Sequence, residues 1–201
     1  TYIVQSKHHR VAMMTNSVQT LSESQRRLVA EWAAECAERV LWLFEAESPS
    51  DDRPRSAIAR ARAFARGELD TAVEIRQRFG GGSAAREVKS PAAAAAARAA
   101  GQASAVCHMG AHALGAAAYA VKAVSLAAPD RPEAAQNEIE WQVGHMTVAV
   151  RSALRSLPPV GENRSGPLGP GLLASGQLGT IIRNLQARLA DDNERHPNHL
   201  A

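Results

Sequence analysis

Apolar side chains recur every three or four residues between Val29 and Phe44, and acidic side chains fall between them. This period is typical of an amphipathic helix that buries one stripe of its surface. Ser22 or Ser24 can cap its N-terminus, and Gln25 stands three residues after Ser22, where a capping box requires it. The predicted stripe consists of Val29, Trp32, Ala33, Cys36, Val40, Leu43 and Phe44.

Two side chains of this predicted helix could carry more than packing. Cys36 lies within the stripe, so we expect a buried thiol that acts as a small apolar group. Trp32 is expected in the core, whereas Trp42 falls off the stripe. We therefore expect partial exposure of Trp42, with contact to a partner or cover by the N-terminal arm.

Proline and glycine divide the rest of the chain into further helical segments. Asp52 is positioned as an N-cap, with Pro54 in the first turn that follows. The alanine tract after Pro91 continues a helical pattern for an unusual length, so we expect a kink near Gly101. The predicted helices cover residues 52–66, 68–79, 91–128, 132–157 and about 181–190.

Four segments interrupt or flank these helices. Residues 1–20 are expected to form an N-terminal arm, and the three glycines at 80–82 a flexible loop. Residues 158–176 are rich in Gly, Pro and Ser and are predicted to be a long connection. Residues 191–201 are expected to form a polar tail. We interpret residues 1–201 as a single helical domain.

The composition favours helices throughout. Aromatic residues make up 4% of the chain, while about one residue in five is alanine. Alanine is the best helix former, and strands prefer β-branched and aromatic side chains. The predicted fold is therefore all-α: a compact bundle of about five to seven helices around a long alanine-rich central helix.

Charge and hydropathy exclude several classes of protein. The formal net charge is +3, and arginines alternate with acids instead of forming a block, so we expect no nucleic-acid partner. No apolar run reaches the length of a membrane span, so we expect no membrane partner. Only two cysteines occur, Cys36 and Cys107, and no signal peptide is recognised. These features predict a cytoplasmic protein.

His108 and His112 are the sharpest candidate site. Spaced four apart, they would project from one helix face, in a stripe that includes Tyr119. With a third ligand from His145, Glu138 or Glu140 they could hold a transition metal. Zinc-protease and di-iron sequence motifs are absent, however, and we expect no metal or cofactor. Two buried or pocket-lining histidines are the favoured interpretation.

A second cluster contains Asp52, Arg53 and Glu68. Capping and a salt bridge between helix ends explain it most simply. If it meets the histidines in space, the two clusters would line one polar pocket in an apolar bundle. Trp141 on a following helix is a further candidate for contact with a ligand or partner.

Three segments carry a resemblance to a known family. They read LVAEWAAECAERVLWLFE, DDRPRSAIARARAFARGE and AAARAAGQASAVCHMGAHALGAAAYAVKAV. Over about residues 28–124 the chain resembles a bacterial helical family of immunity proteins, the fifth-numbered type of the polymorphic-toxin immunity series. The triple glycine and the long segment after Pro129 depart from its pattern.

The resemblance implies a non-enzymatic protein that binds and neutralises a toxin or toxic small molecule. One alternative is a small-molecule-binding protein or an enzyme of secondary metabolism that uses a polar His108/His112 pocket. Whether there is catalysis stays open. In another alternative, a structural or regulatory protein forms a homodimer through its apolar C-terminal helix.

Overall fold

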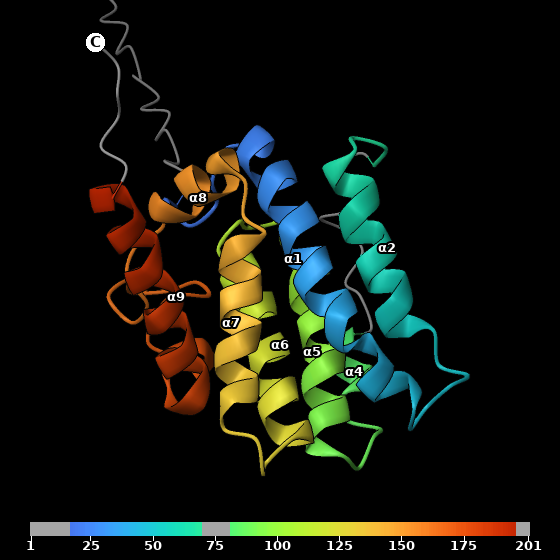
Figure 1. Cartoon of the computed structure of the whole chain (residues 1–201). Coiled ribbons are helices and arrows are strands. Elements are labelled where there is room, and N and C mark those ends of the chain that lie inside the picture. Colours follow the sequence, from blue (N-terminus) through green and yellow to red (C-terminus); the bar gives the residue numbers. More distant parts are fainter. Residues whose placement is uncertain (1–16, 70–80, 196–201) are drawn as a thin grey trace, which may run out of the picture.

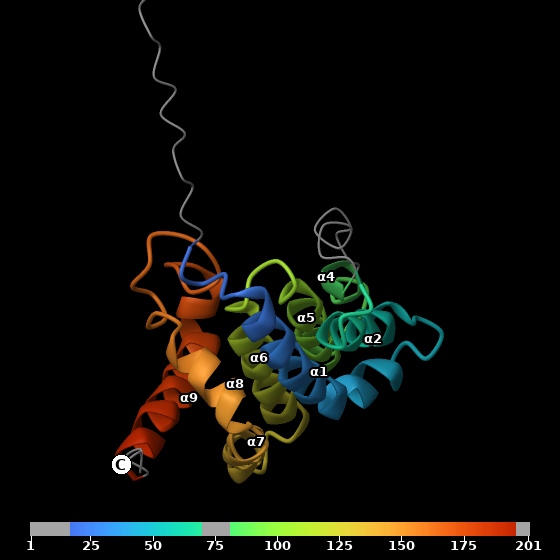
Figure 2. The same ribbon diagram turned by 90° about the horizontal axis from the view of Figure 1, so that it is seen from above.

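Helix α1 (Glu23–Glu45) lies at the centre of the structure, a computed structural model that describes residues 17–69 and 81–195. It packs against α2, α5, α6 and α8 (Figure 1). Seen from above, α2 lies at one edge of the bundle and α9 at the other (Figure 2). The described residues form eight α-helices and no strand, which confirms the all-α prediction.

The start and the buried face of α1 agree with the sequence prediction. The Ser22 hydroxyl accepts a hydrogen bond from the Gln25 backbone, and the Gln25 side chain accepts one from the Ser22 backbone. Trp32 and Cys36 are buried, whereas the Trp42 side chain is 61% exposed. Burial also raises the pKa of the Cys36 thiol well above its usual value. The thiol therefore serves as packing.

Helix α2 (Arg53–Ala65) begins where the sequence predicts, but its cap differs. The Asp52 side chain makes no capping hydrogen bond. Instead, Asp51 Oδ1 accepts the Arg53 backbone N–H at 3.1 Å, because a carboxylate two residues before an amide can close an Asx turn. Asp52 thus occupies the predicted N-cap position, but the side chain that bonds to the start of α2 is that of Asp51.

The triple glycine is not simply a loop. Gly81 and Gly82 form the first half of a short helix, α4 (Gly81–Ala84). Of the predicted helix at 68–79, residues 68 and 69 are non-helical and the remainder lies outside the described residues.

The predicted long alanine-rich helix is a hairpin of two helices, α5 (Pro91–Ala105) and α6 (His112–Ala127). The break lies at residues 106–111 and not at Gly101, which is inside α5. There the Gly110 and Ala111 backbone N–H groups donate to the carbonyls of Thr20 and Gln19. Those bonds replace the helical ones, so the N-terminal segment ends α5.

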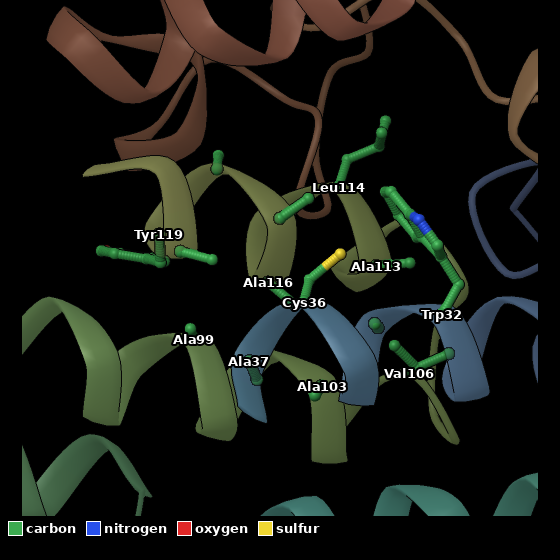
Figure 3. Packing of buried hydrophobic residues seen from close by; sticks show 14 of the residues in the cluster. Trp32, Cys36, Ala37, Ala99, Ala103, Val106, Ala113, Leu114, Ala116 and Tyr119 are labelled. Atoms are coloured by element: carbon green, nitrogen blue, oxygen red, sulfur yellow. The ribbon is translucent and has the colours of Figure 1, made fainter. Parts of the chain in front are cut away.

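Small side chains hold the centre of the bundle together. Alanines from α1, α5 and α6 meet around Cys36 (Figure 3). Because alanine side chains are small, two helices that meet through alanine faces can bring their backbones close together. The distance between their axes is then at the short end of the usual range. The labelled alanines of this contact are Ala37, Ala99, Ala103, Ala113 and Ala116.

The predicted helix at 132–157 is also two helices, α7 (Glu133–Gly144) and α8 (Val148–Arg155). Thr147 caps α8 by accepting a hydrogen bond from the Val150 backbone at 3.2 Å. A residue whose side chain caps a helix has extended backbone and lies outside that helix. Helices α7 and α8 therefore cannot be continuous. The resulting bend turns α8 across the end of α1 (Figure 1).

Residues 158–171 form the predicted long connection, followed by a 3₁₀ turn, η1 (Leu172–Ala174), and the last helix, α9 (Gly176–Arg195). The predicted polar tail is thus helical as far as Arg195. Gln19 is buried and ties this region to the N-terminal segment, since its side chain bonds to Ser165 and Leu168 backbone atoms. The core includes Leu168, Leu173, Leu178, Ile182, Leu185 and Leu189.

Most of the predicted N-terminal arm, residues 1–16, lies outside the described residues. Among the helices that the structure does describe, none combines the length and the apolarity that crossing a membrane requires.

Candidate functional site

The structure separates the polar cluster predicted around α2. Arg53, at the start of α2, forms ion pairs with Asp51 and Glu87, both at 2.6 Å. Glu68, beyond its end, pairs with Arg66 at 2.6 Å. A helix of 13 residues is about 20 Å long, so Asp52 and Arg53 lie far from Glu68. The two ends of α2 do not form one pocket.

The two histidines do not share a helix face. His108 lies in the turn between α5 and α6, and His112 is the first residue of α6. His112 Nδ1 lies 2.8 Å from Gln102 Oε1, which requires a proton on that nitrogen. Burial, and then the charge of His108, lowers the pKa of His112 to about 4, so its ring is neutral at pH 7. His112 is thus held by an internal hydrogen bond.

Tyr119 and Trp141 lie in different parts of the fold. The Tyr119 ring lies between α5 and α6 (Figure 3) and is buried. Trp141, on α7, stacks on His145 with ring centroids 3.9 Å apart, and the Arg39 guanidinium lies 3.8 Å from its ring centroid. Trp141 therefore belongs with α1 and α7, and not with the histidine pair.

The possible third metal ligands have other partners. Glu138 is buried and receives two hydrogen bonds from Arg39 Nε and one from Nη2, at 2.9–3.1 Å. His145 Nδ1 donates to the Trp141 carbonyl at 2.8 Å, and Glu140 accepts from Gln136. Within residues 17–69 and 81–195, no three His, Cys, Asp or Glu side chains converge to hold a metal ion.

An open groove of about 500 Å³ runs along α1. We call it the α1–α8 groove, because six of its lining residues lie on α1 and Val150 lies on α8. The end of α2 and the bend before α8 close its sides. Its lining consists of Ser24, Arg27, Leu28, Glu31, Trp32, Glu35, Ala65, Arg66, His145, Thr147 and Val150.

The groove is mainly apolar, and one of its apolar lining side chains is exposed. Trp32 and Val150 supply buried surface, and the Trp32 indole N–H donates to the Gln142 carbonyl at 3.0 Å. The exposed one is Leu28, whose side chain is 42% exposed. Exposed large apolar side chains beside an apolar hollow are typical of an interaction site.

The charges of the groove leave one carboxylate unmatched. Arg27 pairs with Glu23, Arg66 with Glu68, and Glu31 with Arg62. Glu35 is half-buried, and no ion pair joins it to another described residue. Burial, and then the nearby charge of Glu31, raises the pKa of Glu35 above its usual value.

A sequence model for a family described as "Imm-5 like putative immunity protein" matches residues 19–149, about two thirds of the chain. The chain belongs to this family. The match extends the resemblance seen at residues 28–124 at both ends. No curated protein and no solved structure matches the chain.

The Imm-5 like part covers α1 to the first turn of α8. Every lining residue of the α1–α8 groove except Val150 lies within it. The connection and α9 lie beyond it, yet they supply part of the buried core. The groove is thus a feature of the family-matched part of this chain.

Sequence reasoning missed the groove because its walls come from helices distant in the chain. Leu28 and Glu35 are seven residues apart and therefore share a face of α1. That spacing was a usable signal on one wall. Val150 gave none, because in an unbroken helix at 132–157 it would have no relation to α1. Only the bend at residues 145–147 brings α8 to the groove.

Proposed function

We propose that this chain neutralises a protein toxin by binding it in the α1–α8 groove. The observation that carries the proposal is half-buried Glu35, which has no ion pair with another described residue, in an apolar groove lined by the exposed Leu28. Membership of an immunity-protein family supports a toxin as the partner in general. The mode of action requires binding alone and no chemical step.

Apolar contact supplies the affinity. The groove exposes mostly carbon, so a partner side chain that enters it removes apolar surface from water on both sides. Leu28 lines the groove, is 42% exposed and would be covered by the same partner segment. Aromatic and large aliphatic anchors are the side chains that fill such hollows in protein interfaces.

Charge supplies the selectivity. A cation placed beside Glu35 would remove the cost of its desolvated carboxylate, whereas an acidic partner would increase that cost. The arginines that line the groove do not supply this cation, because Arg27 pairs with Glu23 and Arg66 pairs with Glu68. The expected partner segment therefore presents an apolar anchor next to a lysine or arginine.

His145 and Trp141 extend this surface. Their stacked rings lie at the end of the groove, and Arg39 covers the other face of the indole. Because the His145 Nδ1 proton is held by the Trp141 carbonyl, Nε2 is left to accept a hydrogen bond from the partner.

The test uses the toxin domains encoded beside the gene for this chain, each expressed singly in a bacterial host. Co-expression of the wild-type chain should restore growth against one of them. Leu28→Glu should abolish protection with little change in melting temperature, because Leu28 lines the groove, is 42% exposed, and a charge there opposes apolar contact. Glu35→Gln should weaken binding of that toxin about tenfold, as loss of a charged pair does.

Leu172→Glu is the matched control, because Leu172 is 67% exposed and lies outside both the groove and the family match. It should protect as well as wild type. Failure of wild type against every neighbouring toxin would overturn the function itself. Protection that survives Leu28→Glu, or a dimer that only Leu28→Glu dissociates, would overturn the groove as the toxin site.

A further inference from the structure

A second hollow, of about 370 Å³, lies where α4, α5 and α6 meet. It shares no residue with the α1–α8 groove and has a different chemical character. Its lining is mainly polar. We call it the arginine pocket; it is lined by Gly82, Arg86, Arg98, Gly101, Gln102 and Tyr119.

Two arginines face this pocket, and the described residues supply no balancing acid. Among them no carboxylate lines the pocket, and none forms an ion pair with Arg86 or Arg98. Other arginines of the described chain, such as Arg53 and Arg62, form ion pairs with nearby carboxylates. Two unpaired guanidinium groups at one concavity create a local positive potential that attracts anions.

Tyr119 adds a buried donor. Its side chain is 3% exposed, runs between α5 and α6 (Figure 3), and lines the pocket. Burial raises the pKa of the phenol, an effect that the charge of Arg98 opposes, so the hydroxyl keeps its proton at pH 7. Within the described residues this hydroxyl makes no hydrogen bond, and it is not one of the fully buried polar atoms without a partner. It is therefore accessible from the pocket and can bond to a ligand there.

Gln102 completes the set of donors. Its Oε1 accepts the proton of His112 Nδ1, so the orientation of its amide is set from the protein side. The Nε2 group then has two hydrogens and no acceptor among the described residues. The two guanidinium groups, the Tyr119 hydroxyl and the Gln102 Nε2 group therefore line the pocket as hydrogen-bond donors that find no acceptor among the described residues.

We propose that the arginine pocket binds the phosphate group of a small phosphorylated molecule. The two guanidinium charges match a phosphate dianion, and guanidinium geometry suits bidentate contact with its oxygens. The pocket volume lies within the range of small-molecule sites, which leaves room for an organic group beside the phosphate. At Gly82 an added side chain would meet no atom within 4 Å, so the pocket is open there.

Isothermal titration calorimetry of the full chain tests this proposal with adenosine monophosphate, inorganic phosphate, citrate and adenosine at constant ionic strength. Adenosine monophosphate should bind with a Kd below about 1 mM, inorganic phosphate more weakly, and adenosine and citrate not measurably. Arg98→Gln should raise the Kd about tenfold, because it removes a charge-assisted hydrogen bond. Tyr119→Phe should raise it about threefold and leave the fold intact.

Arg164→Gln is the control, because Arg164 is an exposed arginine outside the pocket. It should bind as wild type does. The proposal is overturned if neither phosphate compound binds, if citrate or adenosine binds as tightly as adenosine monophosphate, or if Arg164→Gln weakens binding as much as Arg98→Gln. A melting curve for each variant shows that it is folded.

Discussion

His112 keeps a neutral imidazole at pH 7 because burial disfavours its protonated form and no neighbouring group offsets that effect. Its neighbours are His108, whose charge also disfavours protonation, and the neutral Gln102 amide. The ring therefore has a pKa of about 4 in the folded chain against 6.5 in an unfolded one. This difference links the folding equilibrium to pH.

We expect His112→Gln to reduce the acid sensitivity of the fold. Because the folded pKa of His112 is depressed, the unfolded chain takes up a proton first, and stability is lost as pH falls from 6.5 to about 4. Over that window wild type should lose on the order of 3 kcal/mol more than the variant. Urea unfolding at pH 7, 5.5 and 4 measures this; parallel pH profiles would contradict it.

Two glycines near helix ends differ in how closely other atoms pack around them. At the start of α9, Gly179 allows the helix to lie on the Ala174 carbonyl, where an added Cβ would come within 2.3 Å of the oxygen. At the end of α7, an added Cβ on Gly144 would meet nothing within 4 Å. Two helical glycines thus differ in whether the fold needs them.

We expect Gly179→Ala to destabilise the chain by about 1–3 kcal/mol, since the clash is with backbone that cannot rotate away. Gly144→Ala should leave stability unchanged or raise it by up to about 1 kcal/mol, through helix propensity. Thermal unfolding of both variants measures the difference. Equal stability of the two would show that α9 does not pack on the 3₁₀ turn as described.

At the scale of the whole molecule, the chain beyond the family match belongs to the core. Leu185 on α9 is fully buried, and α9 packs on α6 and α7. Gln19 also bonds to the connection before α9 and so joins the two ends of the described chain. We propose that residues 17–195 unfold as one cooperative unit, as a single domain would.

Leu185→Ala should therefore lower the stability of the whole chain by about 2–5 kcal/mol, while Leu172→Ala should change it by less than about 0.5 kcal/mol. Both variants should unfold in one transition when followed by circular dichroism and by tryptophan fluorescence. A second transition, with only that one shifted by Leu185→Ala, would mean that α9 forms a separate unit.

The arginine pocket was only partly predictable. The sequence grouped Tyr119 with His112 by their spacing along one helix, and Gln102, which lines the pocket beside Tyr119, bonds to His112. Arg86 and Arg98 gave no signal, because exposed arginines are common and only the meeting of α4 with α5 gathers them. Asp52, Arg53 and Glu68 looked related in the sequence, but a straight helix keeps its two ends apart.

The sequence alone determined the helical state, the Ser22–Gln25 capping box, the buried stripe of α1 and the start of α5 at Pro91. Each of these features depends on residues close together in the chain. The sequence also indicated the family, through the three segments that resemble it. The tertiary structure decided where the helices at 91–128 and 132–157 break, and it decided both pockets. Gly110 turns because it bonds to Thr20, some 90 residues earlier, and no local pattern can encode a contact over that separation.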